Sequence, residues 1–197
     1  MKNRFRLAIA ATAAAALIFA ATPANATGGR APTGTIVDVA VAASGGGTPD
    51  SNPGDYDILV QALLATGLDG ALSDTSTKYT VFAPNDRAFL RLVTDLTGSV
   101  PASESAALAT ITSTFTTDQL SNILLYHVVA GKKLGPIAVL LSKSLTMANG
   151  GIVRPRGITL RDETPTLADP HLVLWKINIQ ASNGVIHTID RVLVPAS

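Results

Sequence analysis

Helical and strand-like patterns occupy different halves of this 197-residue chain, and this separation constrains the fold more than any other feature. Before Ser144, apolar residues recur at helical spacing, as in 55–66, 85–96 and 116–124. After Ser144 the chain consists of short β-branched runs separated by turn residues. Because alternating βαβ units would mix the two patterns, we predict an α+β fold whose antiparallel sheet is formed largely by the second half.

The predicted strands are short and are bounded by turn signals. They cover 79–82, 126–129, 145–147, 152–154, 157–161, 172–176, 177–180 and 185–194. Asn183-Gly184 predicts a two-residue hairpin turn with a positive φ at Gly184. The segment 44–54, SGGGTPDSNPG, predicts a mobile surface loop, because such a composition offers no core-facing side chains.

The N-terminus has the pattern of a secretory signal. Lys2, Arg4 and Arg6 precede an apolar run, and Ala24-Asn25-Ala26 provides a small-residue cleavage site. We therefore predict a signal peptide at 1–26, a flexible segment at 27–34 and a single domain at 35–197, with cleavage after Ala26 and an extracellular location. The alternative is a retained N-terminal anchor, although the run is short for a membrane span and no later segment is long enough.

Composition excludes several classes of protein. The absence of cysteine excludes disulfides, thiolate zinc sites and a cysteine nucleophile, and 15 basic against 14 acidic residues gives no sign of nucleic-acid binding. The chain contains no G-x-S-x-G, H-E-x-x-H or Walker A motif. We interpret Asp86 and Asp118 as helix-start residues, and His171 as a solvated turn residue. We therefore expect no catalytic residue, cofactor or metal.

Three segments contain residues typical of strand ends, helix caps and turns, and we interpret these residues as structural. The segments are Tyr79 to Phe89, 124–131 and 183–193. The residues singled out within them are Thr80, Phe82, Pro84, Asn85, Phe89, Tyr126, His127, Asn183, Gly184, His187 and Asp190. In this order and spacing, the three segments resemble the signature motifs of the fasciclin domain family, over roughly residues 33–195.

This resemblance implies helices packed on a β wedge or sandwich, with the motif residues in structural roles. We interpret His127 and His187 as core histidines with satisfied hydrogen bonds; the alternative is a ligand or catalytic base. Family members often carry Asp-Ile before the last motif, in a segment linked to adhesion. Here the segment reads Asn178-Ile179, which makes these two residues a candidate interaction segment that lacks the carboxylate.

The resemblance implies a secreted, non-catalytic adhesion or protein-interaction module, bacterial to judge from the Ala-rich leader. Its expected partner is an extracellular protein or a cell-surface polysaccharide. One alternative is a carrier for a small apolar ligand, bound in a cleft between helices and sheet. Another is a hydrolase with a scattered His/Asp/Ser set, which would need a serine near His127 or His187 in an open cleft.

Overall fold

Capping residues fix where the helices begin in the computed structural model, which describes residues 32–196. Thr35 and Asp38 form a capping box on the first helix, as do Thr116 and Gln119 on the sixth, while the Asn85 side chain caps the fourth. The helices are α1 (Ile36–Ala43), α2 (Asp57–Thr66), α3 (Leu68–Leu72), α4 (Asp86–Thr97), α5 (Glu104–Thr114), α6 (Thr117–Leu125) and α7 (Pro136–Leu141). None of these helices is long and apolar enough to cross a membrane. The predicted signal peptide and most of the flexible segment lie outside the described residues.

The strands form two sheets. They are β1 (Tyr79–Pro84), β2 (Val128–Ala130), β3 (Leu145–Thr146), β4 (Ile152–Arg156), β5 (Thr159–Arg161), β6 (Ile179–Ala181) and β7 (Gly184–Ile189). One sheet has the order β2-β1-β7-β6 and the other β3-β4-β5. The α+β prediction is confirmed. However, the central pair β1–β7 is parallel, whereas the other pairings are antiparallel, and both β1 and β2 come before Ser144.

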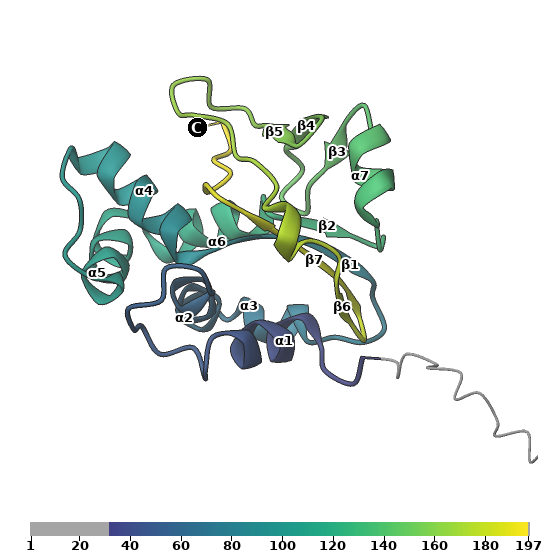
Figure 1. The fold of residues 1–197 in the computed structure, drawn as a ribbon, viewed down its shortest axis with the longest axis horizontal. Coiled ribbons are helices and arrows are strands. Elements are labelled where there is room, and N and C mark those ends of the chain that lie inside the picture. Colours follow the sequence, from purple (N-terminus) through teal and green to yellow (C-terminus); the bar gives the residue numbers. More distant parts are fainter. Residues whose placement is uncertain (1–31, 197) are drawn as a thin grey trace, which may run out of the picture. The chain divides into compact units, whose positions relative to one another are not determined.

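The central strands β1 and β7 separate two apolar cores. Helices α1, α2 and α3 lie on one side of them, and β3, β4 and β5 lie on the other (Figure 1). Successive β1 residues alternate between the cores: Val81 and Ala83 pack with the helices, whereas Phe82 packs with Val153 and Leu160 of the second sheet. A strand buried on both faces explains why β1 reads as a continuous apolar run rather than an alternating one.

The structure corrects three local predictions. Residues 172–176 do not form a strand: an isolated bridge at Leu172 leads into a 3-10 helix, η1 (Leu174–Lys176). The turn between β6 and β7 is Ser182-Asn183, and Gly184 is the first residue of β7, without a positive φ. The reason for a glycine here is close approach, since a Cβ at 184 would stand 2.7 Å from Ile36 Cδ1 and still closer to the Tyr79 carbonyl oxygen.

The third correction concerns two positions of the loop 44–54: Ser44 and Gly47 pack on the helices, whereas Gly45, Gly46, Thr48 and residues 50–52 are exposed, as expected of a surface loop. Ser44 is buried, and its hydroxyl accepts a hydrogen bond from the Tyr56 N–H at 3.0 Å. Gly47 is also buried, and a Cβ there would meet Val60 Cγ1 at 2.5 Å. Gly47 therefore allows the backbone itself to lie against α2, a contact that composition does not reveal.

Candidate functional site

The first motif fastens β1 to the elements on both of its sides. The Thr80 hydroxyl donates to the Lys132 carbonyl and accepts from the Leu134 N–H, both at 2.8 Å, which holds the loop after β2. Phe82 stacks on the ring of His187, with centroids 5.9 Å apart. Pro84 ends β1, and the Asn85 side chain accepts from the Ala88 N–H at 3.0 Å. Phe89 is buried in the helical core.

The second motif joins α6 to the far end of the chain. The Leu193 N–H donates to His127 Nε2 at 2.9 Å, so Nδ1 carries the proton and donates to the Ile123 carbonyl at 2.8 Å. Burial lowers the pKa of His127 to about 4, which keeps the ring neutral. The Tyr126 hydroxyl donates to the Ile152 carbonyl at 2.9 Å and so reaches the second sheet.

The third motif ties β7 and the turn before it to five other segments. His187 Nδ1 accepts from the Asn178 N–H at 3.3 Å, and Nε2 donates to the Leu134 carbonyl at 2.9 Å. Burial lowers the pKa of His187 as well. Asn183 accepts from the Ile36 N–H at 2.9 Å and donates to the Leu72 carbonyl at 2.7 Å. Asp190, at the end of β7, pairs with Arg91 at 3.1 Å.

Both motif histidines therefore bond to backbone groups through both ring nitrogens. Each side chain is buried, and none of the hydrogen bonds found in residues 32–196 joins either ring to a serine. A catalytic base needs a free nitrogen within reach of a reacting group. This arrangement gives His127 and His187 no such nitrogen.

The candidate interaction segment lies beside an exposed apolar surface that the sequence analysis missed. Asn178 is exposed with φ of 60°, and its side-chain oxygen accepts from Gln180 Nε2 at 2.8 Å, while Ile179 is half-buried. Just before it, on η1, Leu174 is 55% exposed and Trp175, the chain's single tryptophan, is 85% exposed. We call residues 174–178 the Trp175 segment.

Three contacts hold the Trp175 segment to the rest of the fold. The Val173 N–H donates to the Thr188 carbonyl of β7 at 2.9 Å, immediately before the segment. Lys176 Nζ donates to the Gly54 carbonyl at 2.7 Å and lies 5.8 Å from the centroid of the Tyr56 ring. Asn178 is fixed through His187. The exposed indole is therefore carried on an anchored backbone, which limits the entropy lost when a partner binds.

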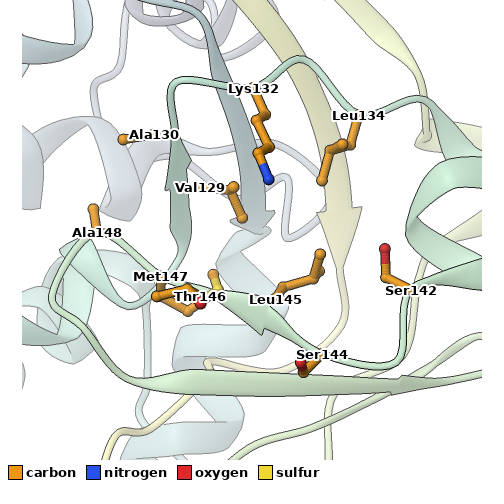
Figure 2. Close-up of a pocket in the computed structure, with 10 residues that line it drawn as sticks. All are labelled: Val129, Ala130, Lys132, Leu134, Ser142, Ser144, Leu145, Thr146, Met147 and Ala148. Atoms are coloured by element: carbon orange, nitrogen blue, oxygen red, sulfur yellow. The ribbon is translucent and has the colours of Figure 1, made fainter.

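A second surface feature is an open cleft of about 520 Å³ between β2 and β3. Its lining combines apolar side chains such as Val129, Leu134 and Leu145 with Lys132 and hydroxyl groups. Figure 2 shows Lys132 reaching down between Leu134 and Val129, with its amino group toward the middle of the cleft. By contrast, the space between helices and sheet, where the alternative hypothesis places an apolar ligand, measures about 20 Å³, room for one water molecule.

A comparison with protein-family models identifies a fasciclin domain at residues 54–195. The chain belongs to the fasciclin domain family. Among curated proteins it is similar to two from Synechocystis sp. (strain ATCC 27184 / PCC 6803 / Kazusa). It is 33% identical to Protein sll1483, in a match that covers 71% of this chain and 67% of that protein. It is 30% identical to the uncharacterized protein sll1735, in a match that covers 71% of this chain and 89% of that protein.

Among solved structures, the fasciclin chain is similar to a FAS1 domain pair from the insect cell adhesion molecule fasciclin I. The match has a TM-score of 0.56 and 17% identity, and it covers 83% of this chain. It covers 51% of the insect chain, so this protein spans about half the length of that domain pair. At this identity the likeness shows a common fold, and the protein is a fasciclin-type module.

The sequence carries only a partial signal for the exposed tryptophan. In the run Leu172–Ile177, Trp175 is followed at once by a lysine and lies in a segment bounded by Asp169-Pro170 and the turn at Asn178. The prediction of a strand at 172–176 gave no reason to single out the tryptophan. Only the tertiary structure shows that the backbone turns into a 3-10 helix there and leaves the indole in solvent.

Proposed function

We propose that this protein is a secreted, non-catalytic interaction module that contacts its partner through the Trp175 segment. The observation that carries the proposal is the indole of Trp175, which is 85% exposed beside the half-exposed Leu174. Tryptophan is enriched among the residues that dominate interface energies, because it buries a large rigid surface at low entropic cost. Family membership and the leader at 1–26 support an extracellular location for this contact.

The proposed partner is an extracellular protein, with a cell-surface polysaccharide as the other outcome of the same test. The segment offers aromatic and aliphatic surface together with the amide of Asn178, and it lacks the carboxylate expected of the family. Recognition would therefore rest on apolar burial and amide hydrogen bonds rather than on an acidic contact. Binding should accordingly depend weakly on salt.

The test is a binding screen of the immobilised protein and its Trp175→Ala variant against matrix proteins, envelope polysaccharides and cells. We expect the variant to lose at least about tenfold in affinity for the partner found, with an unchanged melting temperature, since the indole contributes little to the core. Val100→Ala is the matched control, because Val100 is 80% exposed at the turn between α4 and α5. Equal binding by native protein and Trp175→Ala would refute the proposal.

A second candidate function is supported by the cleft between β2 and β3. Its volume of about 520 Å³ falls within the range of about 300–1,000 Å³ that small-molecule sites occupy. Its mixed lining and Lys132 favour an amphipathic ligand with an anionic group over a wholly apolar one. A ligand screen on Trp175→Ala distinguishes the two functions, because that variant leaves the cleft intact.

A further inference from the structure

Five carboxylates meet at one edge of the helical layer. Asp57, Asp86 and Glu104 are the first residues of α2, α4 and α5, respectively, while Asp50 and Asp55 come from the loop before α2. Single oxygens of Asp50, Asp55 and Asp57 all lie within 4.8 Å of one another, and so do single oxygens of Asp55, Asp86 and Glu104. We call these five residues the acidic cluster; Asp55 belongs to both groups.

No cation of the described residues neutralises the acidic cluster. The four ion pairs found in residues 32–196 are Arg91–Asp190, Arg161–Asp169, His171–Asp190 and Arg191–Asp95, all elsewhere in the fold. Lys176 approaches the loop, but its amino group bonds to the Gly54 carbonyl rather than to a carboxylate. The cluster therefore concentrates negative charge without a basic partner.

Part of this charge is held by backbone N–H groups. Asp86 accepts from the N–H groups of Asp57 at 3.1 Å and Ile58 at 2.8 Å, and Glu104 accepts from the Asp50 N–H at 2.8 Å. These bonds cap α2 and fix the loop to α5. They explain why Asp86 and Glu104 are buried, but they leave other oxygens of the cluster without partners.

The unpartnered oxygens point to a missing ligand. Both carboxylate oxygens of Asp57 and Oδ1 of Asp55 are buried with no hydrogen-bond partner, and the two residues are 0% and 4% exposed. A buried carboxylate without a partner is strongly destabilising. Burial, together with the neighbouring carboxylates, raises the pKa of Asp57, Asp86 and Glu104. A bound cation would remove this penalty for the whole cluster at once.

We propose that the acidic cluster is a calcium-binding site. Its donors are all oxygens, which excludes the nitrogen and sulfur ligands that zinc prefers. Calcium accepts six to eight oxygens at about 2.4 Å, so oxygens that share one ion lie no more than about 4.8 Å apart, a limit that both groups satisfy. Magnesium demands a stricter octahedron and retains water, which suits this carboxylate-rich and largely buried site less well.

The site also has an entrance. Asp50 is exposed, whereas the other four carboxylates are buried, so an ion can enter from the Asp50 side. Asp50 and Asp55 lie on the loop before α2, and the exposed Asp50 side chain is open to solvent. The competing account is that the N-termini of α2, α4 and α5, with bound protons, balance the charge alone. Calcium titration separates the two accounts, because helix termini and bound protons alone predict no saturable calcium binding.

The test uses the native protein after exhaustive dialysis against a chelator. Calcium chloride alone is titrated by calorimetry up to about 10 mM, which covers the affinities typical of extracellular calcium modules. We expect saturable binding of one ion and a melting temperature that rises with calcium concentration. Magnesium chloride should bind at least about tenfold more weakly. The absence of saturable calcium binding, or preferential binding of magnesium, would overturn the proposal.

Two variants separate the site from general surface charge. Asp57→Asn should weaken calcium binding at least about tenfold yet melt no lower than the native protein in chelator, since the Asp57 carboxylate accepts no hydrogen bond there. Asp118→Asn is the matched control, an exposed carboxylate in the first turn of α6 that should leave calcium binding unchanged. If Asp57→Asn fails to fold, Asp50→Asn provides the same comparison at an exposed position. Native-like calcium binding by the Asp variant tested would refute the site. Because no partner is needed, this outcome is independent of the Trp175 segment.

Discussion

At the scale of single residues, buried polar side chains link the layers, and His127 is the clearest case. Its ring joins α6 to the backbone of Leu193, and its own carbonyl accepts from the Phe82 N–H of β1 at 2.9 Å. One residue thus connects a helix, the central strand and the C-terminal segment. The ring must be neutral because one nitrogen accepts from the Leu193 N–H while the other donates to the Ile123 carbonyl, and a protonated ring has no acceptor nitrogen.

His127→Ala should therefore lower stability and leave binding intact. The variant leaves a cavity and deprives the Leu193 N–H and the Ile123 carbonyl of their partner, for an expected loss of about 1–4 kcal/mol. Denaturant unfolding measures the loss, and partner binding per folded molecule should match the native protein. His171→Ala is the control, since that side chain is 49% exposed and should change stability by less than about 0.5 kcal/mol. A stable His127→Ala that no longer binds would assign the ring to a functional site.

At the scale of elements, the parallel pairing of β1 with β7 depends on the glycine at the start of β7. Gly184 pairs with Tyr79 across the sheet and with Ala181 in the hairpin. The first residue of β7 packs closely between the β1 backbone and Ile36 of α1. A side chain at this position would push α1 or β1 away.

Gly184→Ala should thus destabilise the protein by about 1–3 kcal/mol through overpacking. Gly70→Ala is the control, because Gly70 lies within α3, where an added methyl group would meet nothing within 4 Å, and the change should be neutral or slightly stabilising. Thermal unfolding compares the two. Gly184→Asn distinguishes a need for positive φ from a lack of space for a side chain. Asparagine adopts positive φ more readily than most residues, but its Cβ would meet the same neighbouring atoms. A native-like melting temperature for that variant would therefore contradict the close-approach explanation.

At the scale of the whole molecule, buried titratable groups of opposite kinds make stability depend on pH in opposing ways. Burial lowers the pKa of His127 to about 4, against about 6.5 in the unfolded chain. Between these values the unfolded state binds more protons, so this histidine makes the fold less stable as pH falls. The raised pKa values of Asp57, Asp86 and Glu104 act in the other direction, because there the native state binds more protons.

The contribution of His127 can be isolated by comparing native protein with His127→Gln at constant calcium concentration. The native protein should lose about 3 kcal/mol more than the variant between pH 6.5 and pH 4, which is the shift of the His127 pKa expressed as free energy. Urea unfolding at each pH measures the difference. Parallel pH profiles would show that the ring already titrates normally in the folded state.

Local sequence was sufficient to predict the features that depend on neighbours along the chain. The helical patterns at 55–66, 85–96 and 116–124 and the three family motifs are local patterns, and the structure has α2, α4 and α6 where the helical patterns predict them. The α+β class followed from the same kind of evidence, because helical and β-branched periods are properties of short segments. Recognition of the family needed only the order and spacing of those motifs.

Long-range packing settled the features that depend on residues distant in sequence. Three features depend on how segments about a hundred residues apart pack. They are the parallel pairing of β1 with β7, the role of Gly184 in a close contact rather than a turn, and the exposure of Trp175 to solvent. The acidic cluster is the sharpest example. Asp86 and Glu104 each look like an ordinary helix start, and only packing brings them to Asp55, where the same carboxylates form one buried concentration of charge. Local patterns specify backbone conformation, whereas the environment of a side chain is set by whatever the completed fold places around it.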